Sequence, residues 1–291
     1  MRNNKSVLTI GTFDGVHKGH EFLIQKTLDA AKKNNLKSVV VTLAKPVKNI
    51  NGLLSSYEEK IDFLKNCGID EIVVIAVPSE ILNLSPDEFY DKVLIDELNV
   101  QCIICGIDFA FGKNRVGNIE WLLKKSKKSG VEVNIIKPLK ILSKIVSSSH
   151  IRNLLHKSDV ESANKLLGRE YSFSGSPFRE KGIGTKIGFP TINIKASKDK
   201  ILPYGVYVSL ISQGDRTYPS VTSIGNRPTL DRGEKIVTES HVLDFNGRWN
   251  KRETTVHLIK KIRAEKKFKN LEALKKAIAK DITTAKKFFN L

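Results

Sequence analysis

Residues 11–20 read GTFDGVHKGH, a turn rich in glycine that connects two patterned stretches. The preceding run, VLTI at 7–10, is short and apolar, and 21–34 alternates apolar and charged residues with a helical period. This arrangement predicts a buried strand, a tight turn and an amphipathic helix. We expect the helix to open near His17, where free N–H groups and the positive end of the helix dipole form a natural phosphate site.

Glycines and histidines determine what this turn can bind. Gly11 and Gly15 let the backbone come close to a ligand. His17 and His20 are three residues apart, so they share a face of the helix and can each donate a hydrogen bond to phosphate, while Gly19 leaves room for a nucleotide. Attack of a phosphate oxygen on the α-phosphate of ATP suits this pattern, because that step needs charge stabilisation. The plain alternative is two helix-start histidines without a ligand.

The first half of the chain alternates between strand and helix patterns. Runs rich in Val and Ile, as expected for strands buried on both faces, lie at 7–10, 38–42, 71–77, 102–106 and 131–136. Helical patterns lie between them at 21–34, 57–67, 86–98 and 118–129, and SPDEF at 85–89 supplies a helix-start signal. Such alternation predicts a parallel sheet that binds ligands at the carboxyl ends of its strands, where the quoted turn lies.

The second half follows a different pattern. Two short helices are expected after residue 146, ending at Gly168. From 170 to about 262, β-branched and alternating runs are separated by turn residues, which is typical of an antiparallel barrel or sandwich. Helical periodicity returns after Asn270, the expected cap, with one apolar face made of Leu271, Leu274, Ile278, Ile282, Ala285 and Phe289. We interpret the chain as two domains, α/β over 1–168 and mostly β over 169–291.

Composition narrows the class of protein. The apolar content is 40% and the charged content 27%, and no apolar run reaches the length of a membrane span. Strand-like sequence begins too early for a signal peptide, so a cytoplasmic location is expected. The net charge of +18 comes from lysines scattered along the chain. It favours a solvated surface that attracts anionic substrates. Nucleic-acid binding is the alternative, but neither a zinc finger nor an aromatic RNA-binding strand supports it.

Cys102 and Cys105 form a CxxC pair, and Cys67 is the third cysteine of the chain. Metal and redox pairs of this spacing normally lie on turns, and a structural zinc site needs two further ligands. Here the pair lies within a predicted strand, where a spacing of three residues points the two thiols to opposite faces. We therefore expect both thiols to be buried in the core.

Several sequence blocks, taken in order, resemble a known family. The HxGH pattern is similar to that of the nucleotidylyltransferase superfamily. The longer blocks resemble the bifunctional bacterial riboflavin kinase/FMN adenylyltransferases, also called FAD synthetases. They cover nearly the whole chain: TIGTFDGVHKGH (9–20), GIDFAFG (106–112), SSSHIR (147–152), LLGREY (166–171), GFPTIN (188–193), PYGVY (203–207), IGNRPT (224–229), ESHVLDF (239–245) and IRAEKKF (262–268).

The resemblance implies a fold and two reactions. The fold is an α/β nucleotidylyltransferase domain with a Rossmann-like parallel sheet, followed by a β-barrel riboflavin kinase domain with a C-terminal helix. The barrel domain phosphorylates riboflavin to FMN with ATP and Mg²⁺. The first domain transfers AMP from ATP to FMN and releases pyrophosphate, giving FAD. We expect small-molecule substrates only, with no nucleic-acid or membrane partner, and we favour a monomer.

For the first domain, the resemblance implies that His17 and His20 hold the ATP phosphates and stabilise the departing pyrophosphate. Ser148 and Arg152 would bind the β- and γ-phosphates, where a guanidinium gives paired contacts. The remaining positions implied to line the nucleotide site are Gly11, Phe13, Asp14, Gly15, Gly19, Gly106, Asp108 and Phe109. A plain surface charge at Arg152 and a turn residue at Asp108 are the structural alternatives.

For the second domain, Thr191 would ligate Mg²⁺ and Asn193 would support that site, in keeping with the preference of Mg²⁺ for oxygen ligands. Glu239 would take the proton from the riboflavin 5′-hydroxyl. Strand alternation places Glu239 and His241 on one face, although an exposed strand residue is the alternative reading. The resemblance also implies ATP or phosphate binding at Gly182, Gly184 and Lys186 of a glycine-rich flap, and at Pro190 and Thr191 of GFPTIN. The stretch GIGTKIG is also compatible with a plain hairpin.

Two departures from the family pattern leave alternatives open. Members commonly carry an Arg after the flap glycine, where this chain has Thr185 followed by Lys186. Many also have a Phe-x-Pro-His-Pro-like segment after the second strand, whereas 42–48 read TLAKPVK. One alternative is therefore a riboflavin kinase with a weak or altered adenylyltransferase. Another is a basic nucleic-acid-binding protein built on a nucleotidylyltransferase relic.

Overall fold

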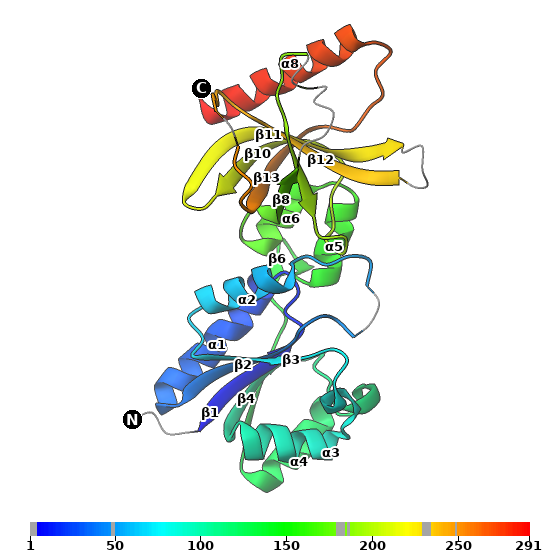
Figure 1. The fold of residues 1–291 in the computed structure, drawn as a ribbon. Helices are drawn as coiled ribbons and strands as arrows, with labels where there is room; N and C mark the ends of the chain where they lie inside the picture. The colour runs from blue at the N-terminus through cyan, green and yellow to red at the C-terminus, as the bar shows by residue number, and fades with distance from the viewer. Residues whose placement is uncertain (1–4, 48–49, 179–183, 185–186, 229–233, 248) are drawn as a thin grey trace. The chain divides into compact units, whose positions relative to one another are not determined.

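The chain divides into two compact units (Figure 1). The computed structural model describes residues 5–47, 50–178, 184, 187–228, 234–247 and 249–291. Unit 1 comprises Met1–Asn51 and Ser55–Ser148, and unit 2 comprises Gly52–Leu54 and Ser149–Leu291. The domain boundary expected at Gly168 stays a prediction.

A parallel sheet forms the centre of unit 1, as the alternating pattern predicts. Its strands follow the order β3-β2-β1-β4-β5, and every neighbouring pair is parallel. Their bounds are β1 Ser6–Gly11, β2 Lys37–Leu43, β3 Glu71–Ile75, β4 Val100–Gly106 and β5 Glu132–Ile136. A small hairpin, β6 Lys140–Ile141 and β7 Lys144–Ile145, follows. The chain runs outward from β1 to β3 and returns to β4 on the other side. The carboxyl edge of β1 is therefore the switch point where such sheets bind ligands.

Helices connect these strands. They are α1 Lys18–Asn34, α2 Tyr57–Asn66, α3 Pro86–Glu88 and α4 Ile119–Ser129, with the π-helical η2 Phe89–Glu97 and the short 3₁₀ turns η1 Glu80–Asn83 and η3 Lys113–Arg115. The helix predicted over 21–34 begins earlier, because His17 caps it. The helix predicted over 86–98 divides into α3 and η2, and Ser85 caps α3 through the expected capping box. Among the described residues, no helix is long and apolar enough to cross a membrane.

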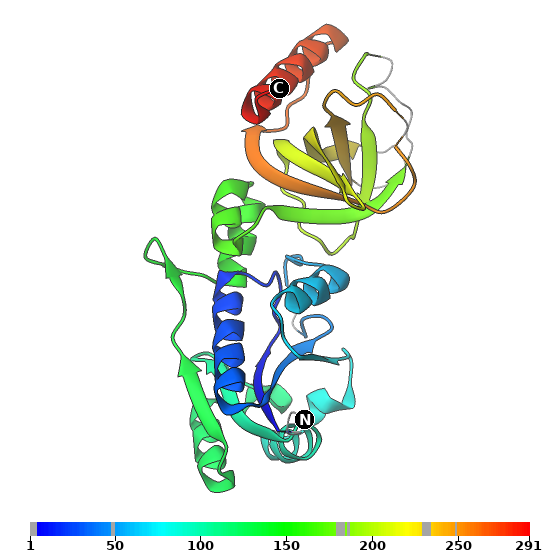
Figure 2. The ribbon, with the colours of Figure 1, turned by 90° about the vertical axis from the view of Figure 1, so that its left-hand side faces the viewer.

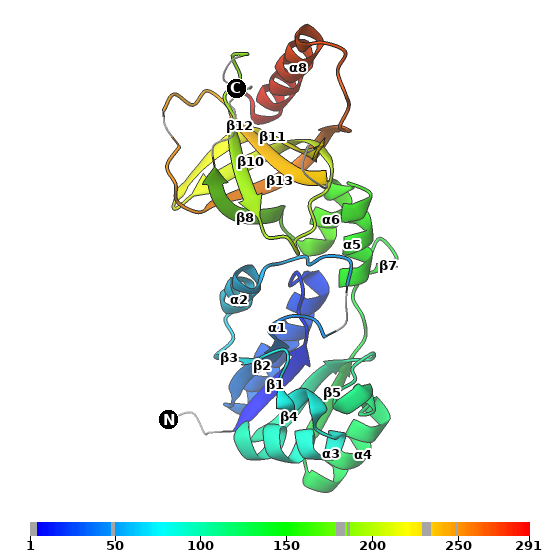
Figure 3. The same cartoon turned by 45° about the vertical axis from the view of Figure 1, so that its right-hand side comes forward.

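Both faces of the sheet are buried, which explains the Val- and Ile-rich strands. Helix α1 covers one face, where Ala31 packs with Val7 and Cys102 (Figure 2). On the other face, Cys105 belongs to a cluster that includes residues of η2 and α4 (Figure 3). The prediction that the two thiols are buried on opposite faces is confirmed.

Unit 2 is a closed antiparallel barrel. It is preceded by helices α5 Ser148–His156 and α6 Val160–Leu167, and Gly168 ends α6 in the left-handed conformation. Within the described residues the strand order is β10-β11-β12-β9-β8-β13. The bounds are β8 Tyr171–Phe178, β9 Ile192–Ala196, β10 Gly205–Gln213, β11 Arg216–Pro228, β12 Glu234–Val242 and β13 Thr254–Arg263. Of the two architectures that the pattern allowed, the barrel is the one formed.

Helix α8, Leu271–Phe289, packs beside the barrel (Figure 2). Asn270 caps it as predicted, and Ala285 is fully buried against barrel residues. Leu271, assigned to the apolar face, is instead 53% exposed, because it lies in the first turn beyond the buried part of that face. The sequence pattern does not reveal the buried Asp281, which accepts paired hydrogen bonds from the guanidinium of Arg263 on β13.

The cysteines give a test of the core of unit 1. Cys105 is fully buried, and burial raises the pKa of its thiol to about 12. Burial also raises the pKa of Cys102, whereas Cys67 is half-buried. At pH 8 only about one in 10⁴ thiols with a pKa near 12 is ionised, and the thiolate is the reactive form.

We therefore expect the native chain to react with DTNB (5,5′-dithiobis(2-nitrobenzoic acid)) at no more than one thiol within minutes. All three thiols should react after unfolding in guanidinium chloride. Fast reaction of two or three thiols in the native protein would show that β4 is not buried on both faces.

Candidate active sites

The turn after β1 has an unusual backbone. Phe13, Gly15 and Val16 have φ values of 50°, 82° and 32°, all in the left-handed region. Glycine adopts this region freely, but a β-branched residue rarely does. Phe13 and Val16 are each 1% exposed and pack with Ile24 of α1 in one hydrophobic cluster. Burial therefore holds the backbone in a conformation that most residues avoid, as is common at ligand-binding turns.

Hydrogen bonds fix the Asp14–Gly15 segment of this turn. The Oδ1 of Asp14 accepts from the N–H of Ser55 at 3.1 Å, and the N–H of Gly15 donates to Ser55 Oγ at 3.0 Å. Ser148 Oγ donates to the backbone carbonyl of Asp14 at 3.0 Å. The structure thus brings Ser148 to the turn, as the predicted site requires. Asp14 is 4% exposed, so its carboxylate belongs to the interior of the turn.

His17 and His20 lie together at the start of α1. Their rings stack with centroids 3.6 Å apart, and Phe13 meets the His20 ring edge-on at 5.1 Å. The Nδ1 of His17 accepts a hydrogen bond from the backbone N–H of His20 at 3.2 Å, which makes His17 the cap of the helix. A neutral His17 ring therefore carries its proton on Nε2 and can donate from that atom. His17 is 4% exposed and His20 is half-buried, so His20 presents more of its ring to solvent.

Glycines at two positions make room for these rings. A Cβ on Gly19 would lie 3.1 Å from the His17 ring and 3.3 Å from the carbonyl oxygen of Val146. A Cβ on Gly11 would lie 3.1 Å from the ring of Phe13. Close packing of the turn itself therefore accounts for both glycines, in addition to the space for nucleotide that the sequence suggests.

The end of β4 lies beside the end of β1, because the two strands pair. Gly106 ends β4, and a Cβ there would lie 3.0 Å from an oxygen of Asp108. Asp108 is exposed. The half-buried ring of Phe109 stacks on Phe111 with centroids 5.4 Å apart. Gly106 thus ends the strand that neighbours β1, and Asp108 and Phe109 follow shortly after it.

Arg152 belongs to unit 2, unlike the histidines. Its Nε donates to the carbonyl oxygen of Gly52 at 3.2 Å, within the same unit. The segment Gly52–Leu54 joins unit 2 because Leu53 pairs with Lys200 in a β-bridge. The phosphate contact implied for Arg152 stays a prediction.

In unit 2, Glu239 of β12 lies directly opposite Asn193 of β9 and Ser223 of β11. Directly opposed residues of antiparallel strands share a face of the sheet. The alternate residues Thr238 and Ser240 are buried, with exposed fractions of 2% and 0%, whereas Glu239 is half-buried. The barrel wall therefore places the predicted base and the predicted metal-site residue side by side.

Asn193 has an orphaned polar atom. It is 7% exposed, and its Oδ1 has no hydrogen-bond partner among the described residues. Buried polar atoms are nearly always satisfied, so an unpartnered oxygen suggests that a ligand completes its contacts. A Cβ built on Gly184 would lie 3.2 Å from Thr191 Oγ1, which places the described flap glycine beside the predicted metal ligand. The other flap residues, Gly182, Thr185 and Lys186, lie outside the described residues.

His241 supports the backbone of this segment. Its Nδ1 is 2.8 Å from the carbonyl oxygen of Pro190, and its ring meets Phe189 edge-on at 6.1 Å. Because the ring nitrogen donates to a carbonyl, the hydrogen bond ties β12 to the residues that precede Thr191. In the described part of the chain, no group of three or more His, Cys, Asp or Glu side chains is placed to hold a metal.

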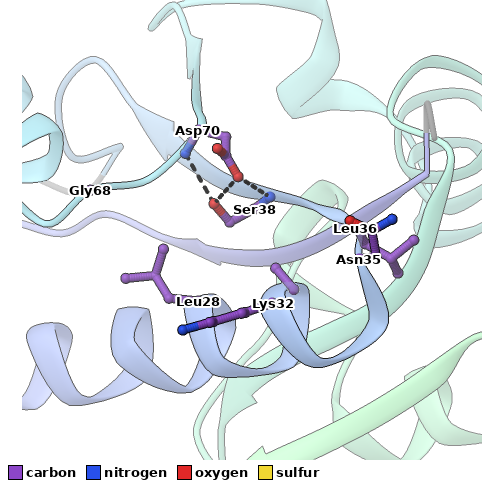
Figure 4. A pocket seen from close by; sticks show the side chains of 8 residues that line it. Leu28, Lys32, Asn35, Leu36, Ser38, Gly68 and Asp70 are labelled. Carbon is purple, nitrogen blue, oxygen red and sulfur yellow. Dashed lines mark hydrogen bonds between the residues drawn. The ribbon is translucent and has the colours of Figure 1, made fainter. Parts of the chain in front are cut away.

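A cavity of about 310 Å³ lies in unit 1 at the amino ends of the sheet strands, away from the carboxyl ends where the histidine turn lies (Figure 4). It is lined by the end of α1 and by the starts of β2 and β3, where Ser38 Oγ donates to Asp70 at 2.7 Å. None of the predicted site residues lines it. The amino ends of the strands therefore carry a separate feature, unconnected with the turn after β1.

Sequence reasoning missed two residues near the turn after β1, Ser55 and Lys60. Ser55 binds the turn, and Lys60 of α2 is 4% exposed, with its ammonium donating to backbone carbonyls at the end of β2. A signal for Lys60 was present. It is four residues before the buried Leu64, so it lies on the face of α2 that the helical pattern assigns to the core.

Comparisons with known proteins cover both units. Residues 1–150 match the FAD synthetase family and residues 167–289 match the riboflavin kinase family. A bifunctional riboflavin kinase/FMN adenylyltransferase of Buchnera aphidicola subsp. Schizaphis graminum is 36% identical, over 99% of this chain and 96% of the relative. The enzyme of that name from Escherichia coli K12 is 33% identical, over 98% and 93%. The crystal structure of a macrolide-efflux protein from Streptococcus pneumoniae superposes with a TM-score of 0.87 at 26% identity, over 98% of this chain and 97% of that one.

Proposed function

The chain belongs to the family of bifunctional riboflavin kinase/FMN adenylyltransferases, and on this premise we propose which of its residues serve each reaction. The enzyme phosphorylates riboflavin to FMN and adenylylates FMN to FAD, with ATP as co-substrate. Adenylyl transfer is assigned to the turn after β1 in unit 1. Phosphoryl transfer is assigned to the wall of the barrel in unit 2.

In unit 1, an oxygen of the FMN phosphate attacks the α-phosphate of ATP, and pyrophosphate leaves. The Nε2–H of His17 and the ring of His20 donate hydrogen bonds to phosphate oxygens as negative charge develops. The stacked arrangement fixes both rings before the substrate arrives, and preorganised donors of this kind are the main source of rate enhancement in such steps. The free N–H groups at the start of α1 add to the same positive potential.

Ser148 has a positioning role in this assignment. Its hydroxyl holds the carbonyl of Asp14 at 3.0 Å and so keeps the backbone of the turn in place. Gly106 at the end of β4, with Asp108 and Phe109 shortly after it, lines the nucleotide pocket, and the phosphate contact of Arg152 stays a prediction. The observation that carries the assignment is the capped and stacked histidine pair at the switch point of the sheet.

In unit 2, Glu239 accepts the proton of the riboflavin 5′-hydroxyl, whose oxygen then attacks the γ-phosphate of ATP, and ADP leaves. The cross-strand position of Glu239 opposite Asn193 supports this role, because it places a carboxylate beside the predicted phosphate end of the site. A carboxylate on a barrel strand is also held more rigidly than one on a loop.

Mg²⁺ fits the residues of this site. Thr191 Oγ1 and Asn193 Oδ1, which has no partner among the residues that the structure describes, are the oxygen donors that would hold it, together with phosphate oxygens. When bound, the cation would neutralise charge on the ATP phosphates. Few protein ligands are expected for Mg²⁺ when it binds with a nucleotide, which agrees with a site made of one hydroxyl and one amide.

Three further properties belong to the proposal. A cytoplasmic location is one of them. A monomer is the favoured oligomeric state. The lysine-rich surface is assigned to attraction of anionic substrates rather than to nucleic-acid binding.

The histidine pair provides the first test of site assignment. We expect the double substitution His17→Asn and His20→Ala to lower FAD formation from FMN at least about 10²-fold, as loss of one oxyanion donor does elsewhere. Asn is chosen at position 17 because it is a favoured helix cap and keeps α1 intact. Riboflavin phosphorylation by the same preparation should be unchanged.

His156→Ala, at an exposed position of α5, is the matched control. Both activities are measured by chromatographic separation of riboflavin, FMN and FAD. Equal loss of the two activities in a folded variant would overturn the assignment of adenylyl transfer to unit 1.

Glu239→Gln tests the kinase assignment. The amide keeps the size of the side chain but cannot accept a proton, so we expect riboflavin kinase turnover to fall about 10²–10⁴-fold. FAD formation from added FMN should persist. Glu253→Gln, at an exposed position beside β13, serves as control. Kinase turnover of the Glu239 variant within about threefold of the parent enzyme would exclude a general-base role.

A further inference from the structure

Lys60 is a buried cation that the assigned steps do not use. It lies on α2 and is 4% exposed, although lysine is among the residues that proteins most rarely bury. Its ammonium donates to the carbonyl oxygen of Leu43 and, at 3.3 Å, to that of Ala44. These carbonyls belong to the last residue of β2 and the residue after it. The lysine therefore binds the carboxyl edge of the sheet, one strand away from the histidine turn.

The ammonium of Lys60 also interacts electrostatically with the carboxylate of Asp14 in the histidine turn. Burial lowers the pKa of Lys60, and the carboxylate of Asp14 acts in the opposite direction and raises it. Asp14 and Lys60 are each 4% exposed, so their interaction is only weakly screened by water. The backbone adds a geometric link. Ser55 donates its N–H to the Asp14 carboxylate at 3.1 Å, and the N–H of Lys60 donates to the carbonyl oxygen of the next residue, Ser56, at 3.0 Å. The first turn of α2, which carries Lys60, therefore adjoins the carboxylate of the histidine turn.

The charge of Lys60 has a consequence for ATP. The turn carries a buried carboxylate at Asp14, yet it is the place where a triphosphate is to bind. An uncompensated carboxylate would repel the phosphates, since like charges in a partly dry site interact strongly. Lys60, at the end of the neighbouring strand β2, is a buried cation that could supply this compensation, and Ser55, directly before the Ser56 cap of α2, holds the same carboxylate in place. Helix α2 and the residue before its cap therefore each supply one group for Asp14.

We propose that Lys60 is a positioning residue for adenylyl transfer, which binds the end of β2 and balances the charge of Asp14 so that the turn can receive the ATP phosphates. The inference rests on the assignment of adenylyl transfer to unit 1. Lys60 itself is too deeply buried to be assigned a contact with substrate.

A double-mutant cycle on the full-length enzyme tests this. Lys60→Met keeps the length and apolar stem of the side chain and removes its charge. It is measured in the parent enzyme and in an Asp14→Asn background, where no carboxylate needs compensation. Lys65→Met, at an exposed position on the same helix, is the control. The readouts are kcat and KM for ATP in FAD formation, riboflavin kinase turnover, and thermal unfolding.

We expect Lys60→Met to lower kcat/KM for ATP in FAD formation at least about tenfold in the parent enzyme, and less than about threefold in the Asp14→Asn background. Kinase turnover should stay within about twofold in every variant. Equal losses in both backgrounds, or a loss below about threefold in the parent, would overturn the proposal. A purely structural lysine would change the unfolding temperature without this dependence on Asp14.

Folding and site assignment are controlled separately. If Lys60→Met alone unfolds unit 1, the test uses the enzyme with both Lys60→Met and Asp14→Asn, which lacks both charges, and compares its FAD formation with that of Asp14→Asn. FAD formation within about threefold of Asp14→Asn supports the proposal, and a larger loss overturns it. The histidine variants are assayed alongside. If they keep full FAD formation, the placement of adenylyl transfer has failed. If they lose it while Lys60→Met does not, only the role of Lys60 has failed.

Discussion

Burial of Phe13 and Val16 holds the backbone after β1 in a left-handed turn, and the adenylyl transfer that we propose for unit 1 depends on that turn. It ends the strand at the switch point of the sheet and starts α1 a few residues later. The helix can then begin with His17 as its cap. In this position the His17 ring stacks on the His20 ring, and a neutral His17 carries its proton on Nε2. Apolar packing therefore supplies the energy that holds a polar site in place, as strained functional turns require.

Unit 2 obtains rigidity by a different route. Its proposed base and metal-site residue, Glu239 and Asn193, are placed by the register of two antiparallel strands rather than by a strained loop. Closing the sheet into a barrel fixes that register, because a slip of one residue would turn every side chain to the other face. The Oδ1 of Asn193 has no hydrogen-bond partner within the described chain, in keeping with the proposed metal site.

Much of this arrangement could be predicted from the sequence, because periodicity and turn residues are local signals. The parallel sheet, the Asn270 cap and the opposed burial of Cys102 and Cys105 follow from such signals and are confirmed. For the second half these signals allowed a barrel or a sandwich, and the family resemblance implied the barrel that is formed. Tertiary contacts were not predictable in this way. The left-handed conformation of Val16 depends on packing against other elements, and the place of Lys60 depends on which carbonyls α2 meets. The ligand contacts of the site residues stay predictions.

The adenylyl-transfer site of unit 1 and the kinase site of unit 2 are proposed to work independently, and a mixing experiment tests this most directly. Enzyme substituted at both histidines of the turn and enzyme carrying Glu239→Gln are each supplied with riboflavin, ATP and Mg²⁺, separately and as an equimolar mixture. The account predicts that the first preparation stops at FMN, the second converts little riboflavin, and the mixture accumulates FAD through FMN released by one and used by the other. A mixture that makes no more FAD than the better of its two components would contradict the account.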